Sequence, residues 1–259
     1  MAKQTIILIH GFRGTHHGLA LIDKQLSSFH TITPDLPGFG EGEQLASHTL
    51  DTYVEWLKSF IKAQDLKAPP ILLGHSFGSI ICAAYAKKYP TTIKKLVLVN
   101  PIGAPALEGS KGALSMLAVF YYWVGTKLPT QLAHTWLASK IVVKITSVTM
   151  TKTKDTQLRA YIHDQHLRYF SLFHSPESLA EGFKVSVSNS VRDFAPSIHL
   201  PTLLIVGALD DITPLEKQKK LVQLFSDGRL EIIENVGHLT HYETPDQVAA
   251  YVQAFITSS

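Results

Sequence analysis

Several features are scarce in this chain, and each absence narrows its class. Cysteine occurs once, at Cys82, so no disulfide can form within the chain, and its apolar helical surroundings predict a core residue. No run of five basic residues occurs, and a net charge of +3 is too small and too evenly spread to indicate nucleic-acid binding. The longest apolar run, Ala113–Val124, falls short of the roughly 20 residues that span a bilayer.

The N-terminus has too short an apolar stretch for a signal peptide, so we expect a cytoplasmic protein without stable membrane insertion. Apolar residues, by contrast, are plentiful: 45% of the chain is hydrophobic and 17% is charged. This composition can bury a sizeable core. A length of 259 residues fits one large α/β domain or a core with an insertion. The chain could be a monomer or a homodimer.

Short apolar strands alternate with helices at both ends of the chain. All-apolar strands separated by helices indicate a mostly parallel sheet that is buried on both faces, and hence the α/β class. The expected strands are residues 5–9, 31–33, 71–73, 96–99, 203–206 and 230–233. The expected helices of this part are residues 49–63, 80–88, 214–225 and 245–256.

This alternation stops between residues 102 and 196. The periodicity there predicts helices alone, at residues 113–124, 130–140, 156–173 and 176–194. We therefore expect an α/β core made of residues 1–101 and 197–259, with a helical cap at 102–196 inserted into it. The cap carries ten Lys and Arg against six Asp and Glu, an excess of four, which also fits an ordinary solvated helical surface.

The sequence GHSFG, residues 74–78, supplies a candidate nucleophile. It follows a predicted strand and precedes a predicted helix, which is the context that a nucleophile elbow requires. Glycines two positions before and after Ser76 permit a sharp, strained turn. Such a turn would hold the hydroxyl at the carboxyl ends of the strands, where open α/β sheets bind ligands. The alternative is an inert serine in a glycine-flanked turn.

A serine hydroxyl is a poor nucleophile without a base, and the chain offers 13 histidines. His238 follows the strand at 230–233, so we expect it on the same edge of the sheet as Ser76. His163 and His166 lie three residues apart on a cap helix and could bind a metal, but no third ligand matches them. We therefore expect neither a metal nor an organic cofactor. The remaining histidines near strand ends are less well placed: His10, His75 and His241.

The base needs a carboxylate to orient it, and the developing oxyanion needs N–H donors. Asp210 and Asp211 follow the strand at 203–206, and the residues alone leave either one open as the acid. The chain order Ser, Asp, His is the one expected for this kind of sheet. The predicted oxyanion donors are the backbone N–H groups of Phe77, which follows the serine, and Phe12, which follows a glycine in the first loop.

Five stretches together resemble the α/β-hydrolase fold superfamily, in its lidded serine esterase/lactonase-like branch. The resemblance implies Ser76 as nucleophile, His238 as base and Asp210, rather than Asp211, as acid. It also implies Phe12 and Phe77 as oxyanion donors. Asp211 should then face water before a helix that Thr213 caps and Pro214 begins. The five stretches are LIHGF (8–12), DLPGFG (35–40), GHSFG (74–78), GALDDITP (207–214) and GHLTHYETP (237–245).

One departure from the family pattern concerns the stretch after DLPGFG. Glu41-Gly-Glu43 stands where a serine is usual, and its long side chains are expected to alter the mouth of the site.

These observations favour a serine hydrolase that cleaves carboxylic esters of short to medium acyl chain through an acyl-enzyme. The substrate would be a small apolar ester or lactone, such as an acyl-homoserine lactone, because the aromatic stretch 113–124 predicts a hydrophobic pocket. Three alternatives use the same scaffold. They are a C–C bond hydrolase of ring-fission products, a cofactor-free haloperoxidase or acyltransferase, and a small-molecule receptor. The first needs an anchoring arginine, for which the candidates are Arg159, Arg168 and Arg192.

Overall fold

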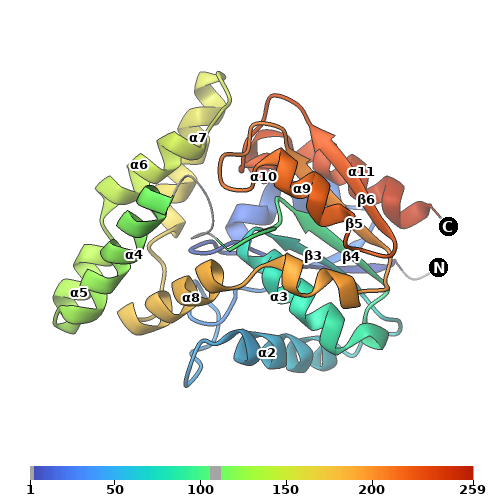
Figure 1. Ribbon diagram of the computed structural model, residues 1–259, viewed down its shortest axis with the longest axis horizontal. Coiled ribbons are helices and arrows are strands. Elements are labelled where there is room, and N and C mark those ends of the chain that lie inside the picture. The colour runs from blue at the N-terminus through green and yellow to red at the C-terminus, as the bar shows by residue number, and fades with distance from the viewer. Residues whose placement is uncertain (1–2, 106–111, 259) are drawn as a thin grey trace.

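A parallel sheet of six strands forms the centre of the molecule (Figure 1), and this confirms the predicted α/β class. The computed structural model describes residues 3–105 and 112–258, except for the side chains of residues 112–115. The strand order is β2-β1-β3-β4-β5-β6, and every neighbouring pair is parallel. The strands are β1 (Thr5–Ile9), β2 (His30–Ile32), β3 (Ile71–His75), β4 (Lys95–Val99), β5 (Thr202–Gly207) and β6 (Gly228–Ile233).

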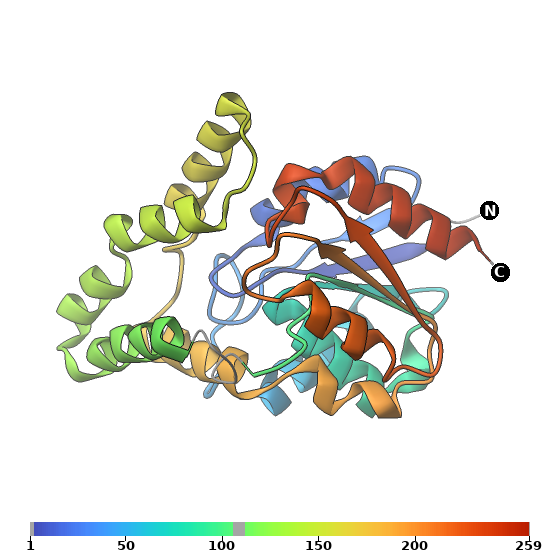
Figure 2. The ribbon, with the colours of Figure 1, turned by 45° about the horizontal axis from the view of Figure 1, so that its top comes forward.

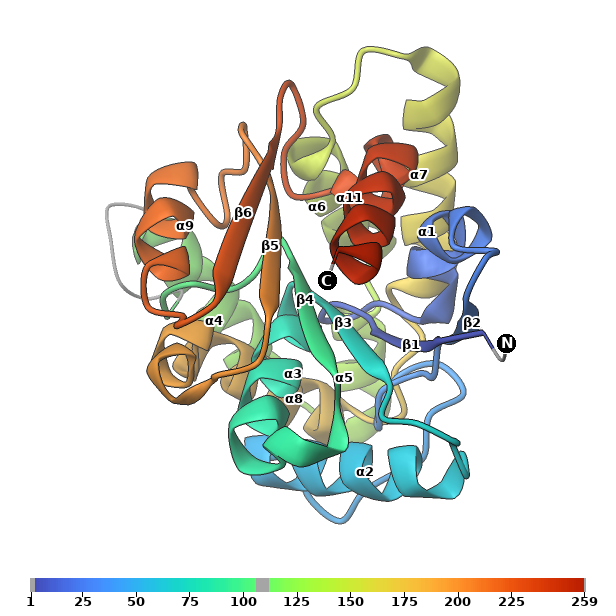
Figure 3. The same cartoon turned by 90° about the vertical axis from the view of Figure 1, so that its right-hand side faces the viewer.

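Helices cover both faces of this sheet (Figure 3), as the all-apolar strands predict. Alternate strand residues enter two separate cores: Leu72 packs with α2 and α3, whereas Leu73 packs with α1 and α11. These helices are α1 (Ala20–Gln25), α2 (Leu50–Ala63), α3 (Phe77–Lys88), α9 (Leu215–Val222), α10 (Thr240–Glu243) and α11 (Pro245–Thr257). Short 3-10 turns lie at His16–Leu19, Pro90–Thr92, Val191–Asp193 and Ala195–Ser197.

Between β4 and β5 the described chain forms five helices in succession, and we call their span, residues 112–188, the helical insertion. Figures 1 and 2 show α4 to α7 standing to one side of the sheet, while α8 returns towards α3. Its helices are α4 (Gly112–Lys127), α5 (Thr130–Leu137), α6 (Lys140–Met150), α7 (Thr156–Tyr169) and α8 (Pro176–Ser188). In the described part of the chain, no helix is both long and apolar enough to cross a bilayer.

The sequence prediction for the insertion was wrong in its middle. The helix predicted at 130–140 ends at Leu137, and a separate helix, α6, covers residues for which no element was predicted. The α6 sequence KIVVKITSVTM is rich in β-branched residues, whose stiff side chains lower helix propensity. Burial of Val143 and Ser147 against α7 overrides that preference. The helices α7 and α8 also end earlier than predicted.

A buried arginine ties the insertion to the core. Arg13 lies in the loop after β1 with φ of 61°. Its Nη2 donates to the carbonyl of Leu137 at 2.7 Å, and its Nε donates to the carbonyl of Phe170 at 2.9 Å. Leu137 is the last residue of α5 and Phe170 caps α7, so the cation lies at two helix C-termini. Unpaired carbonyls and the helix dipole both favour a positive charge there.

Candidate active site

Ser76 occupies a strained turn between β3 and α3, with φ of 51° and ψ of −115°. Glycine is required on both sides of it. A Cβ at Gly74 would lie 2.6 Å from the carbonyl oxygen of Gly78, and a Cβ at Gly78 would collide with the carbonyl oxygen of Ile9. The two glycines therefore allow β3, α3 and β1 to approach closely enough to hold the serine in a sparsely populated conformation.

His238 and Asp210 meet Ser76 in one hydrogen-bonded line. His238 Nε2 lies 2.8 Å from Ser76 Oγ, and His238 Nδ1 lies 2.7 Å from Asp210 Oδ2. Because an ionised carboxylate can only accept, Nδ1 carries the hydrogen and Nε2 is free to accept from the serine hydroxyl. His238 follows β6 and Asp210 follows β5, so the carboxyl ends of three parallel strands bring together residues that are far apart in the chain.

Asp210 is buried and fully surrounded by donors. Its Oδ1 accepts from the backbone N–H groups of Ile212 and Thr213 at 2.7 and 2.9 Å. The hydroxyl of Thr213 donates to Oδ2. Burial by itself would raise the pKa of this carboxyl, but His238 and the Thr213 bonds hold the pKa well below its ordinary value. The Asp210 carboxyl is therefore ionised in the folded protein near neutral pH.

Asp211 faces the other way. Its carboxylate is exposed and lies 2.6 Å from Lys152 Nζ. The predicted helix start after it was wrong, because Pro214 is the N-cap of α9 and no side chain caps that helix. The Thr213 hydroxyl, predicted as the cap, instead donates to Asp210. The hydrogen bond to a buried ionised carboxylate is charge-assisted and strong, so the Thr213 side chain stays on Asp210 and its oxygen accepts no capping bond from an N–H group of α9.

Asn100 is a site residue that the sequence analysis missed. It follows β4, is fully buried, and has φ of 46°, a left-handed conformation that asparagine tolerates better than most residues. Its Nδ2 donates to Asp210 Oδ2 at 2.8 Å, and its Oδ1 accepts from the Thr240 hydroxyl at 2.5 Å. Asn100 therefore joins the loop that carries the carboxylate to the loop that carries His238. The only signal in the sequence is an asparagine directly after a buried strand.

The predicted oxyanion donors, the backbone N–H groups of Phe12 and Phe77, belong to the two chain segments beside Ser76. Phe77 begins α3, so its N–H has no partner within the helix. A Cβ at Gly11 would lie 3.4 Å from Ser76 Cβ, so the loop that continues into Phe12 runs against the serine. The rings of Phe12 and Phe77 lie edge to face at 6.1 Å. This arrangement can bind an anionic oxygen next to the nucleophile.

Aromatic side chains from the insertion complete the apolar side of the site. The centroid of the Phe12 ring lies 5.7 Å from that of Tyr122 in α4 and 5.9 Å from that of Phe183 in α8. The Tyr122 and Phe183 rings stack with their centroids 4.0 Å apart. Tyr122, from the stretch 113–124, thus lies in the aromatic cluster around Phe12. An additional ring, Phe183, was not predicted.

The other histidines near the site have structural partners. His10 Nε2 accepts from the N–H of Leu36 at 2.8 Å, which braces the loop after β1 as expected. His75 points away from the serine towards His241, with ring centroids 4.0 Å apart. Burial lowers the pKa of His75 to about 3, so this imidazole is neutral in the folded protein.

The possible metal pair and the possible anchoring arginines lie outside the Ser76 cluster. His163 Nδ1 and His166 Nδ1 both lie 2.7 Å from Ser147 Oγ. No group of three or more metal-ligating side chains occurs among the described residues. Arg159 donates to the carbonyl of Thr153, and Arg168 pairs with Asp164 on the exposed side of α7. Arg192 lies beside Asp193, beyond the end of α8.

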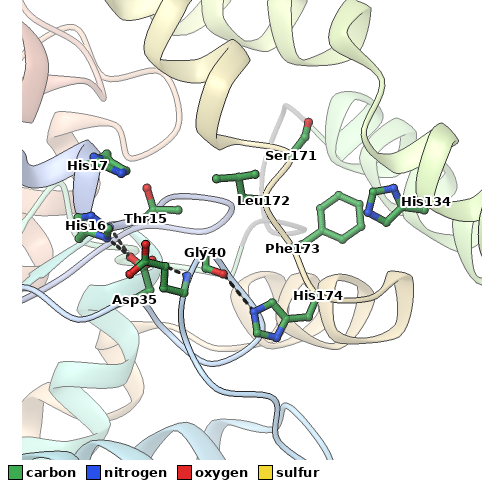
Figure 4. Close-up of a pocket in the computed structure, with 11 residues that line it drawn as sticks. Thr15, His16, His17, Asp35, Gly40, His134, Ser171, Leu172, Phe173 and His174 are labelled. Carbon is green, nitrogen blue, oxygen red and sulfur yellow. Dashed lines mark hydrogen bonds and ion pairs between the residues drawn. The ribbon is translucent and has the colours of Figure 1, made fainter.

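A cavity of about 340 Å³ lies beside the DLPGFG loop (Figure 4). Ser76, His238 and Asp210 are not among the residues that line it. Glu41 lines this cavity and does not lie beside Ser76. The buried Asp35 carboxylate there accepts from the N–H of Glu41 at 2.8 Å, and Gly40 has no room for a side chain beside that carboxylate. The cavity lining is rich in imidazoles: His16, His17, His134 and His174.

Comparison with known proteins places this architecture in a family. The profile of the alpha/beta hydrolase fold family matches residues 4–245. The chain belongs to this family. It is 26% identical to Lipase 1 of Psychrobacter immobilis and 24% identical to Lipase 3 of a Moraxella species, covering 98% and 97% of this chain and 77% of each relative. A thermophilic esterase from Thermogutta terrifontis has the same fold, with a TM-score of 0.79, 20% identity, and coverage of 98% of this chain and 90% of the esterase.

Proposed function

We propose that the protein is a serine hydrolase of carboxylic esters in which Ser76, His238 and Asp210 form the catalytic triad. The observation that carries this proposal is the continuous line of hydrogen bonds from Asp210 through His238 to Ser76. The two lipases among the relatives support ester hydrolysis as the activity.

The proposed reaction has two halves. His238 Nε2 removes the Ser76 proton as Oγ attacks the ester carbonyl, and the N–H groups of Phe12 and Phe77 bind the oxyanion. The imidazolium then protonates the leaving alcohol, which departs and leaves an acyl-enzyme. In the second half, His238 accepts a proton from water as that water attacks the acyl group, and the returned proton regenerates the serine. Asp210 holds the tautomer and stabilises the imidazolium throughout.

The substrate is proposed to be an ester with an apolar acyl chain of short to medium length. The edge-to-face and stacked rings of Phe12, Phe77, Tyr122 and Phe183 support this choice, because apolar pockets select apolar groups. Since Tyr122 and Phe183 come from the insertion, we also propose that it acts as a cap over the site. Lactones are included, because a lactone ring is an ester that the same steps open.

A panel of p-nitrophenyl esters with graded acyl chains tests the proposal, with Ser76→Ala as the matched inactive variant. The expected result is hydrolysis by the native chain that Ser76→Ala reduces to background. Hydrolysis that persists in the variant, or no hydrolysis of any ester by the native chain, would overturn the assignment. Lactone opening followed by pH-stat then separates a lactonase from an esterase that is restricted to open-chain esters.

A further inference from the structure

The helical insertion carries large apolar side chains that the fold leaves uncovered. On α4, Met116, Phe120 and Trp123 are 61, 58 and 52% exposed. Scattered single apolar residues on a surface are ordinary, but a contiguous set indicates a contact site. We define the α4–α5 apolar face by six exposed residues: Met116, Leu117, Phe120, Trp123, Leu132 and Trp136.

These residues lie on two helices that pack against each other. Phe120 and Trp123 stack at 5.9 Å on α4. Trp136 of α5 donates its Nε1–H to the carbonyl of Tyr121 at 3.0 Å, and the Tyr121 and Trp136 rings lie 5.4 Å apart. The two helices therefore present their aromatic side chains as a fixed patch.

The α4–α5 apolar face points away from the candidate active site. The side of α4 that contacts Phe12 is marked by Tyr122, which is 9% exposed. At 3.6 residues per turn, Phe120 lies nearly opposite Tyr122, and Met116 and Trp123 flank Phe120 on the same stripe. The exposed stripe is thus a separate surface from the aromatic lining beside Ser76.

The segment that carries this face has charges of one sign, although exposed Glu177 and Glu181 lie on the neighbouring α8. Residues 112–154 contain five lysines and no aspartate or glutamate. Lys127 continues the α4 stripe, and its Nζ lies 6.0 Å from the centre of the Trp123 ring. Lys140 and Lys144 are exposed on α6. This combination of exposed aromatics and lysines complements an anionic surface with an apolar interior.

We propose that the α4–α5 apolar face docks on the surface of an anionic lipid bilayer. The aromatic side chains enter the interface between headgroups and acyl chains, where tryptophan is stabilised, and Lys127, Lys140 and Lys144 contact the anionic headgroups. A second copy of the chain fits the face less well. A two-fold pairing would place the same lysine-rich surfaces against each other. The chain would lie on the membrane without crossing it.

Vesicle sedimentation tests the proposal with the Ser76→Ala chain, so that lipid turnover plays no part and failure here is distinct from failure of the hydrolase assignment. Phosphatidylcholine vesicles are compared with vesicles that also contain phosphatidylglycerol. The anionic vesicles should retain the protein, and retention should fall as salt is added. Absence of retention on the anionic vesicles would overturn the proposal.

Two added sets of variants locate the contact. Phe120→Ser with Trp123→Ser should weaken binding about tenfold or more, because apolar area no longer enters the interface. Lys127→Ser, Lys140→Ser and Lys144→Ser together should weaken it about 100-fold. Two control variants change residues on the surface of the core. One carries Leu224→Ser, and the other carries Lys219→Ser together with Lys220→Ser. Both should bind the anionic vesicles as the Ser76→Ala chain does. Equal losses in the controls would show that the α4–α5 apolar face is not the contact.

Two further measurements distinguish other occupants. Brominated lipids should quench Trp123 and Trp136 but not Trp56, which is buried in the core. A dimer that the Phe120→Ser and Trp123→Ser changes convert to monomer, without vesicle binding, would assign the face to a second copy. If the Phe120→Ser and Trp123→Ser changes raise KM for soluble long-chain esters and leave vesicle binding unchanged, the α4–α5 apolar face binds the acyl chain of the substrate. Either result overturns the proposal.

Discussion

The sheet core and the helical insertion use apolar residues in opposite ways. In the core, strand residues such as Leu73 and Ile205 are completely buried. In the insertion, Phe120 and Ile141 remain 58 and 73% exposed on helices whose other sides are packed. Burial in the core stabilises one structure and fixes the residues of the candidate triad at the strand ends. Exposure in the insertion contributes little to the fold and leaves apolar surface for contacts outside it.

The strongest test of the core concerns its two adjacent carboxylates. Asp210→Asn should reduce kcat for a p-nitrophenyl ester by about 10⁴-fold, because an amide cannot hold the His238 tautomer. Asp211→Asn should leave kcat unchanged, since the exposed Asp211 contacts Lys152 and not His238. Steady-state kinetics of both variants measures the contrast. A larger loss of kcat in Asp211→Asn would show that Asp211, and not Asp210, is the catalytic acid.

A second test compares burial directly. Leu73→Ala should lower the free energy of unfolding by about 2–5 kcal/mol, because it removes buried methyl groups and leaves a cavity. Phe120→Ser should change it by less than about 0.5 kcal/mol, because this side chain is largely exposed. Urea unfolding followed by circular dichroism measures both. Similar losses would mean that the α4–α5 apolar face is part of the stable core.

A third test loosens the insertion from the core. Arg13→Met should destabilise the protein by about 2–3 kcal/mol, because the carbonyls of Leu137 and Phe170 lose a charged donor. The loss should be local, so limited proteolysis should cut between residues 112 and 170 faster than in the native chain. Arg13→Lys keeps the charge but has no planar fork, and should be intermediate. Unchanged protease resistance in Arg13→Met would contradict this role.

A fourth, smaller effect is expected at Asn100. Asn100→Ala should reduce kcat about tenfold to 100-fold with little change in KM, because Asp210 loses a donor while the substrate pocket is untouched. Asn100→Ser keeps a shorter donor and serves as the conservative comparison. A change confined to KM would show that Asn100 contacts substrate instead of positioning the carboxylate.

The smallest effect concerns buried neutral histidines in both regions. Burial lowers the pKa of His75 in the core and of His166 in the insertion from 6.5 to about 3. Between pH 3 and pH 6.5 the unfolded chain therefore binds more protons than the folded chain. The free energy of unfolding should fall as the pH decreases from 6.5 towards 3. In His166→Gln the melting temperature should depend less steeply on pH in this window. An identical slope would show that His166 does not contribute.

Much of the core could be predicted from the sequence because its signals are local. Short apolar strands bounded by glycine or proline predicted the positions of all six strands, with shifts at their ends. Ser76, His238 and Asp210 each follow a strand, and parallel strands present their carboxyl ends at one edge. The motif order therefore predicted the residues that the fold brings into contact.

The errors arose where contacts outside the predicted element override local preference. The β-branched residues of α6 disfavour a helix until Val143 and Ser147 are buried against α7. Thr213 stands in a good capping position, yet its hydroxyl donates to Asp210 instead. Asn100 carries no motif, and only the convergence of two loops gives it a role.

The sequence by itself determined the fold class, the family, and Ser76 and His238 of the candidate triad, because periodicity and glycine spacing are properties of neighbouring residues; its residue patterns left the acid open between Asp210 and Asp211. The tertiary structure decided which aspartate faces inward, which donors keep it ionised and which apolar residues stay uncovered. Those outcomes depend on the three-dimensional arrangement of hydrogen bonds and packing, which includes bonds between distant segments such as Asn100 with Asp210. No local pattern encodes such contacts.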